Sequence, residues 1–251
     1  MDITDIKGAN VRKILDVLRF SSGMVKREIA SDTGLSFSTV SNVCNALEDL
    51  HILYETKSGD TTVGRTPDKF HFNSGGYCSL CVERPQEDIL RISALDFANK
   101  LLFQTELPLT ADDDAMSLSN YIQQVYEDLA HSQGFSGIEF VGVGLSVSGG
   151  QGHKNRQLTN GLHSNFDNTS LEELIRQRTG LPCYTESQAN LCVVSVSQAG
   201  HDSENILYLH SSTILSVGVI CEGNLLRGRN GNAADIAHIP IGAPDNVCPR
   251  C

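Results

Sequence analysis

The sequence contains no apolar run that approaches the roughly 18 residues of a membrane-spanning helix. Its first residues, MDITDIKGAN, lack the basic and apolar regions of a secretory signal peptide. These absences argue against membrane insertion and export, so we expect a cytoplasmic protein. The chain has 251 residues, of which 40% are hydrophobic and 20% are charged, as is typical of a soluble globular protein with more than one domain.

Disulfide bonds are not expected, although the chain holds eight cysteines. Without an export signal, free thiols together with a metal site explain this number better than a disulfide framework does. Cys78 and Cys81 have the spacing of a metal-binding pair, but residues three apart in a strand point to opposite faces, so we interpret the pair as incidental. We interpret Cys44 as a small helix residue. Three further cysteines are expected to be buried: Cys183, Cys192 and Cys221.

The segment from Met24 to Leu50 predicts two helices joined by a tight turn. The first helix covers residues 26–31, and Gly34 in the turn can take a positive φ without steric cost. Ser36 is a good N-cap for the second helix. That helix places apolar residues at positions i, i+3 and i+7: Val40, Val43 and Leu47. Its other face carries short polar residues: Ser38, Thr39, Ser41, Asn42 and Asn45.

The segments on either side complete this pattern. Upstream, residues 10–20 have apolar side chains at helical spacing, which predicts a third helix. Downstream, residues 51–55 and 69–73 have the pattern of short strands. The loop between these strands contains Gly64-Arg65-Thr66-Pro67, and an arginine in such a loop can enter a narrow minor groove of DNA. The alternative for Arg65 is a solvated loop charge. Together the segments predict a winged helix-turn-helix domain over residues 1–73.

A helix with a buried apolar stripe and a short polar face suits the major groove of DNA. The alternative is an ordinary helical hairpin. We predict that DNA contacts come from six residues: Ser36, Ser38, Thr39, Ser41, Asn42 and Arg65.

Positive charge is scarce for such a role. The net charge is −11, and the predicted recognition helix has no Lys or Arg between Ser36 and Asp49. Residues 1–72 hold nine Lys and Arg against ten Asp and Glu, whereas the remainder holds ten against twenty. Neutralisation of phosphates supplies most non-specific affinity for DNA. A monomer is therefore expected to bind weakly, and a dimer would double the contacts.

From about residue 75 onward, strand and helix signals alternate, which predicts an α/β domain with two successive sheet-building units. Strands are predicted at residues 77–82, 89–96, 100–107, 139–146, 183–185, 205–210 and 215–222. Helices are predicted at residues 111–133, 170–179 and 188–199.

Three motifs in this second part are similar to those of the ROK family, which comprises sugar-responsive bacterial repressors and sugar kinases. They are VGVGLSVSGG at 141–150, TGLPCYTESQANL at 179–191 and GNLLRGRNGNAADIAHIPIGAPDNVCPRC at 223–251. The helix-turn-helix and GRTP loop before them favour the repressor branch. The resemblance implies an α/β fold in which a winged helix-turn-helix over 1–73 precedes an incomplete ribonuclease-H-like, actin-like two-lobe sugar-kinase fold over 74–251.

Departures from the family pattern argue against sugar kinase activity. The phosphate loop after the first body strand reads CVERPQ at 81–86, without glycine. Gln188 stands where the kinases have the aspartate that takes a proton from the sugar, and an amide cannot act as a general base. In the second glycine-rich loop, the side chains of Ile214 and Ser216 should obstruct phosphate approach. The alternatives to a regulator remain a sugar kinase and a degenerate interaction protein without DNA binding.

The resemblance also implies an effector site and a zinc site. Sugar hydroxyl contacts would come from Gly149, Ser187, Gln188, Asp235 and His238, with Asp235 in place of the family's glutamate. The alternatives are a surface acid for Asp235 and a polar helix-start residue for Gln188. Zinc ligands would be His238, Cys248 and Cys251, although Arg250 occupies the family's second cysteine position. CxxC is a common zinc spacing, and the alternative is two free terminal thiols.

The family's body normally continues beyond this length, so we expect either a shortened chain or a degenerate gene product, with exposed apolar surface and self-association. The sequence therefore predicts a cytoplasmic, non-enzymatic repressor of carbohydrate metabolism genes. Its expected partners are operator DNA, a sugar or sugar-phosphate effector, and further copies of the chain.

Overall fold

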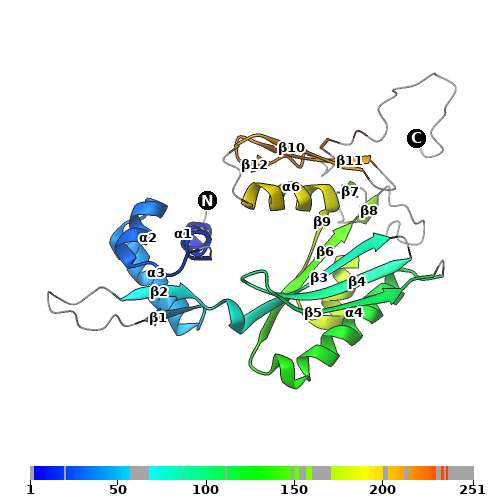
Figure 1. The fold of residues 1–251 in the computed structure, drawn as a ribbon, viewed down its shortest axis with the longest axis horizontal. Coiled ribbons are helices and arrows are strands. Elements are labelled where there is room, and N and C mark those ends of the chain that lie inside the picture. The colour runs from blue at the N-terminus through cyan, green and yellow to red at the C-terminus, as the bar shows by residue number, and fades with distance from the viewer. Residues whose placement is uncertain are drawn as a thin grey trace. The chain divides into compact units, whose positions relative to one another are not determined.

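The computed structural model (Figure 1) describes residues 3–19, 21–56, 68–86, 88–110, 112–147, 150–152, 157–159, 171–199, 203–211, 215–229, 233–234 and 236. None of the helices within these ranges is long and apolar enough to cross a membrane.

The N-terminal elements follow the predicted order of helices and strands. They are α1 (Ile3–Arg19), α2 (Lys26–Thr33), α3 (Phe37–Asp49), β1 (Leu53–Thr56) and β2 (Lys69–Phe72). The strands β1 and β2 pair antiparallel, with Leu53 opposite Phe72. The helix α1 begins at Ile3, earlier than the predicted residue 10.

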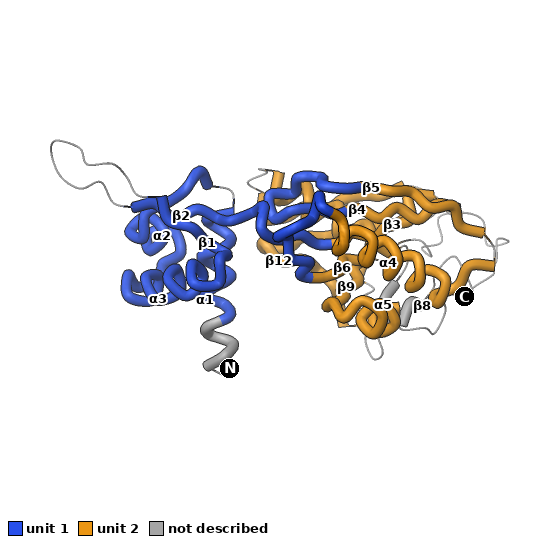
Figure 2. Tube along the Cα trace, turned by 90° about the horizontal axis from the view of Figure 1, so that it is seen from below, with its two compact units in different colours: residues 1–79, 94–103, 133–141 blue, residues 80–93, 104–132, 142–251 orange. Residues whose placement is uncertain are grey.

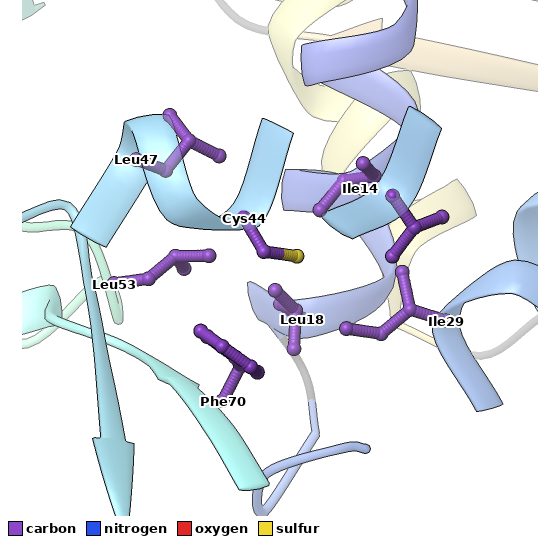
Figure 3. Packing of buried hydrophobic residues seen from close by; sticks show 8 residues of the cluster. Ile14, Leu18, Ile29, Cys44, Leu47, Leu53 and Phe70 are labelled. Atoms are coloured by element: carbon purple, nitrogen blue, oxygen red, sulfur yellow. The ribbon is translucent and has the colours of Figure 1, made fainter. Parts of the chain in front are cut away.

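These elements close a core from their own side chains. In Figure 3 the labelled side chains from all three helices and both strands point toward one another. The buried cluster consists of Ile14, Leu18, Ile29, Val40, Cys44, Leu47, Leu53 and Phe70. The inward residues of α3 are therefore Val40, Cys44 and Leu47, whereas Val43 is only partly buried. Cys44 lies on α3, as interpreted from the sequence, and its thiol is a fully buried part of this core.

The larger sheet has the strand order β5-β4-β3-β6-β9 within the described residues. Its strands are β3 (Tyr77–Gln86), β4 (Ile89–Asp96), β5 (Leu101–Pro108), β6 (Glu139–Val147) and β9 (Cys183–Ser187). The strands β6 and β9 run parallel. Along β3 the buried positions alternate, so Cys78 faces the core while Cys81 lies on the other face, as predicted for this pair.

Two helices belong to this sheet region, α4 (Ala115–Ala130) and α5 (Leu171–Thr179), and they pack against each other. The helix α4 is shorter than the predicted 111–133, because Asp114 caps its start by accepting a hydrogen bond from the Ser117 amide at 2.9 Å. A short hairpin of β7 (Gly150–Gly152) and β8 (Gln157–Thr159) follows β6 in the chain.

A smaller sheet of β10 (Ile206–Ser211), β11 (Leu215–Cys221) and β12 (Asn224–Leu225) packs against α6 (Gln188–Gln198). The approach is close at Gly218, where an added Cβ would lie 2.2 Å from the carbonyl oxygen of Ala189. Gly218 therefore lies within a strand against a helix. Residues 212–214 of the loop predicted before it lie outside the described residues.

Two of the three cysteines expected to be buried are not. Cys183 is fully buried, but Cys192 is only partly buried and Cys221 is exposed. Cys221 is the last residue of β11, where the chain turns through Gly223 into β12 of the same sheet. The alternation of side chains along a strand predicts which face of the sheet a residue lies on, but not whether other elements cover that face.

The described chain divides into two compact units, coloured separately in Figure 2. Unit 1 comprises residues 1–79, 94–103 and 133–141, and unit 2 comprises residues 80–93, 104–132 and 142–251. Unit 1 thus contains the three N-terminal helices together with the turn between β4 and β5. The predicted functional boundary between residues 73 and 74 stays a prediction.

Candidate nucleic-acid interface

The turn between α2 and α3 has the local chemistry that the sequence predicted. Gly34 follows α2 with φ of 67° and ends the helix in the left-handed conformation. Ser36 caps α3, and its Oγ accepts a hydrogen bond from the Thr39 amide at 3.1 Å. The hydroxyls of Ser38 and Thr39 lie within 2.9 Å and 2.8 Å of the same Oγ. The first turn of α3 is thereby held as one hydrogen-bonded group of hydroxyls.

The predicted contact residues are not equally accessible. Ser36, Ser38 and Asn42 are exposed, whereas Thr39 and Ser41 are partly buried. Ser41 and the exposed Asn45 both accept hydrogen bonds from Lys26 of α2, at 3.3 Å and 2.9 Å. Arg65 lies outside the described residues.

Two features of this region were not predicted from the sequence. Phe37, the first residue of α3, is 54% exposed and adds an apolar ring to an otherwise polar first turn. An apolar contact of this kind suits a thymine methyl group. Lys26 was not predicted either, because only the fold brings it to α3. Two further basic side chains of these elements, Arg27 of α2 and Lys69 of β2, are exposed.

A turn of the larger sheet belongs to the same unit as these helices. Arg19, at the end of α1, donates from Nε to the carbonyl oxygen of Phe97 at 3.0 Å and from Nη2 to Asn99 at 2.8 Å. The Phe97 ring stacks on Phe72 and Tyr77, with ring centroids 5.5 Å and 5.7 Å away. The β4–β5 turn is therefore held by the last residue of α1, the last residue of β2 and the first residue of β3.

Tyr77 also contacts the end of α3. Its hydroxyl donates to the carbonyl oxygen of Leu50, the C-cap residue of α3, at 2.8 Å. Nothing in the local sequence pattern indicated these contacts, since Arg19 and Phe97 are 78 residues apart.

The predicted effector residues are described only in part. Ser187 caps α6, and its Oγ accepts from the Asn190 amide at 3.3 Å, while Gln188 is the first residue of the helix and is partly buried. The remaining predicted contacts lie outside the described residues: Gly149, Asp235 and His238.

Glu186, which the sequence reasoning missed, organises the start of α6. Its Oε1 accepts from the Asn190 side chain at 2.8 Å, and its Oε2 accepts from Arg227 Nε at 2.8 Å. Arg227 comes from the segment after β12, so this pair ties that segment to the end of β9. The arrangement supplies carbonyl, hydroxyl and carboxylate groups, but Gln188 has no basic oxygen for proton abstraction.

The predicted metal ligands His238, Cys248 and Cys251 all lie outside the described residues. Among the residues that are described, no group of three or more His, Cys, Asp or Glu side chains is placed to hold a metal ion.

Comparison with known proteins agrees with this α/β architecture. The model of the ROK family matches residues 87–251. The chain belongs to the ROK family. A xylose repressor of Bacillus spizizenii is 25% identical over 256 residues, which cover 100% of this chain and 65% of the repressor. The chain therefore spans about two thirds of the length of that relative.

Solved structures share the fold. The crystal structure of a ROK family transcriptional regulator, a homolog of the Escherichia coli MLC protein, has a TM-score of 0.82 at 19% identity, covering 97% of this chain and 62% of that one. A ROK family glucokinase from Streptomyces griseus, in complex with glucose and AMPPNP, has a TM-score of 0.56 at 21% identity, covering 68% and 52%. Of these two structures, the regulator is the one whose likeness extends over nearly the whole chain.

Proposed function

We propose that this chain is a cytoplasmic, DNA-binding transcriptional repressor of carbohydrate genes that responds to a sugar or sugar phosphate. Residues 1–73 act as a winged helix-turn-helix, and α3 is the recognition helix. The observation that carries the proposal is the start of α3, where Ser36, Ser38 and, one turn on, Asn42 are exposed above a closed core. Amide and hydroxyl groups of this kind read base edges in the major groove.

Several features support the sugar-responsive part of the proposal. The relatives at 25% and 26% identity are named xylose repressors, and a further relative at 20% identity is the regulator NagC of Escherichia coli. The start of α6 presents Ser187 and Gln188, which donate and accept hydrogen bonds as a sugar hydroxyl requires. Because α3 carries no basic residue, we propose that copies of the chain bind DNA together, with the exposed Leu207 and Leu209 of β10 favouring association.

Kinase activity is not part of this proposal, although the fold is shared with a glucokinase. Gln188 stands at the base position, and Gly218 is packed against Ala189 of α6 rather than exposed to a nucleotide. We expect a coupled ATPase assay over a panel of hexoses and amino sugars to stay at background. Turnover that is lost in Gln188→Ala would contradict this.

A zinc ion held by His238, Cys248 and Cys251 is a further, separate proposal. It rests on ligand types and spacing alone. Elemental analysis of protein purified without a histidine tag tests it, and a zinc content near zero with both terminal thiols open to alkylation would overturn it.

The DNA-binding proposal is tested by fluorescence anisotropy with DNA from the intergenic region beside the gene. Thr39→Ala/Asn42→Ala should lower the preference for this DNA over a scrambled duplex by roughly tenfold or more, since a good base contact discriminates by about 1–3 kcal/mol. Asn120→Ala, which removes an exposed amide from α4, is the matched control and should change nothing. Equal affinity for both duplexes in the unaltered chain would sink the proposal.

A further inference from the structure

The side chain of Lys26, the first residue of α2, contacts residues of α3 and β2. Its Nζ donates to Asn45 Oδ1 at 2.9 Å and to Ser41 Oγ at 3.3 Å. The same Nζ lies 4.9 Å from the centroid of the Phe70 ring, a geometry in which the ring face attracts the cation. Lys26 is partly buried, while the next residue, Arg27, is exposed.

One ammonium group thereby joins α2 to α3 and β2. Ser41 and Asn45 are four residues apart and lie one above the other on one side of α3. Phe70 belongs to β2 and is 1% exposed. The apolar stripe of α3 turns one side of the helix toward the core. Hydrogen bonds are directional, so the Lys26 pair adds a restraint on the rotation of α3 about its own axis.

We propose that Lys26 is a positioning residue that sets which side of α3 faces DNA, rather than a ligand of DNA phosphate. This inference rests on the proposed DNA-binding function and deepens it. With Ser41 and Asn45 bonded to Lys26 of α2, the exposed residues at the start of α3 include Ser38 and Asn42. Sequence preference then depends on a residue that touches no base.

The salt dependence of binding separates positioning from phosphate contact. A lysine that neutralises a phosphate contributes about one to the slope of log affinity against log salt. We expect Lys26→Met to lower the preference for intergenic over scrambled duplex about fivefold while leaving this slope unchanged. Arg27→Met removes the same charge from the next residue and is the matched control for charge. A slope reduced by about one in Lys26→Met, with preference intact, would overturn the proposal, and so would no change in either quantity.

A second measurement needs no DNA. It therefore distinguishes a failure of this inference from a failure of the proposed DNA-binding function. In thermal unfolding of the full chain, Lys26→Met and Asn45→Ala should each lower the melting temperature, and their combination should lower it by less than the sum. Strict additivity would show that the pair does not interact. If the chain binds no DNA but the two changes are coupled, the DNA-binding proposal fails while the structural role of Lys26 stands.

Should the Lys26→Met chain not fold, Asn45→Ala carries the test against Asn42→Ala, which removes an exposed amide from the same helix. Asn45→Ala should lower the melting temperature more than Asn42→Ala does, because of these two asparagines Asn45 is the one that accepts a hydrogen bond from Lys26. Equal melting temperatures for the two variants would contradict the proposal.

Discussion

Two helices of this protein, α3 and α6, begin with the same residue in the same role but in different surroundings. Ser36 and Ser187 each accept a hydrogen bond from the amide three residues on, at 3.1 Å and 3.3 Å. The first turn of α3 carries the exposed hydroxyls of Ser36 and Ser38, and the exposed amide of Asn42 lies in the next turn. The first turn of α6 is crossed by the Glu186–Arg227 ion pair and lies beside a strand. The cap residue alone therefore says where a helix starts, but not what its first turn can reach.

The contrast bears on function. An open first turn that lacks carboxylates suits a polyanion such as DNA, because a helix N-terminus favours negative charge. A first turn with a partly buried carboxylate, already paired to an arginine, suits a small neutral ligand such as a sugar. We therefore propose that α3 reads DNA and that α6 takes part in effector sensing.

The largest effect on stability is expected where α6 packs closely against β11, at Gly218. Gly218→Ala would place a Cβ 2.2 Å from the Ala189 carbonyl oxygen and should cost about 2–3 kcal/mol of unfolding free energy as α6 is pushed from β11. Gly34→Ala, in the open turn before α3, meets no atom within 4 Å and should cost only about 1 kcal/mol for its φ of 67°. Urea unfolding measures both. A Gly218→Ala cost no greater than that of Gly34→Ala would contradict the close packing of α6.

The two capping serines offer a sharper comparison with a smaller effect. Replacing Ser36 or Ser187 by alanine should cost about 1 kcal/mol in either helix. Replacement by aspartate keeps a capping oxygen and so should preserve stability, but it adds a negative charge. Ser36→Asp should therefore weaken DNA binding by repelling phosphate, while Ser187→Asp should leave it unchanged. If anisotropy titrations show the same loss for both aspartate variants, α3 has no special relation to DNA.

The reactivity of buried thiols compares the packing around Cys44 with that around Cys183 without any substitution. Burial raises the pKa of Cys44 to about 11, opposed by nearby Lys26, and burial raises the pKa of Cys183 to about 12. At neutral pH, iodoacetamide should label the exposed Cys221 first, while Cys44 and Cys183 stay protected until unfolding. Mass spectrometry of timed samples reads this out, and early labelling of Cys44 would show that the core around α3 is open.

The sign of the pH dependence follows from the same burial. Unfolded thiols lose their protons near their ordinary pKa of about 9, whereas the buried thiols keep theirs until about 11 or 12. The folded state then binds more protons, so stability contributed by these thiols is complete below pH 9 and falls as the pH rises toward 11 and beyond. A Cys44→Ala chain should show a smaller decline over this window.

Local signals in the sequence predicted much of the fold. Gly34 and Ser36 marked the end of α2 and the start of α3, because a left-handed turn and a capping hydroxyl depend on residues close in the chain. The strands of the larger sheet were predicted from their alternation, and β4 has the predicted bounds. The predicted stripe on α3 is confirmed at Val40 and Leu47, and Val43 packs against the core. The prediction missed Cys44, because positions i+3 and i+4 lie on nearly the same side of a helix.

Local sequence signals did not predict the contacts that organise the candidate sites. Lys26 meets Asn45 across 19 residues, Arg227 meets Glu186 across 41, and Arg19 meets Phe97 across 78. Each is a polar bond made possible by tertiary packing, and each residue alone has the pattern of a solvated charge. The predicted DNA contacts on α3, the effector residues and the zinc ligands remain predictions.

Footprinting of the full chain on the neighbouring intergenic DNA at low salt tests the central claim most directly. The account predicts one protected region of defined sequence, lost in Thr39→Ala/Asn42→Ala and retained in Asn120→Ala. Uniform weak protection along the whole fragment, or protection that survives the changes in α3, would contradict the assignment of DNA reading to this helix.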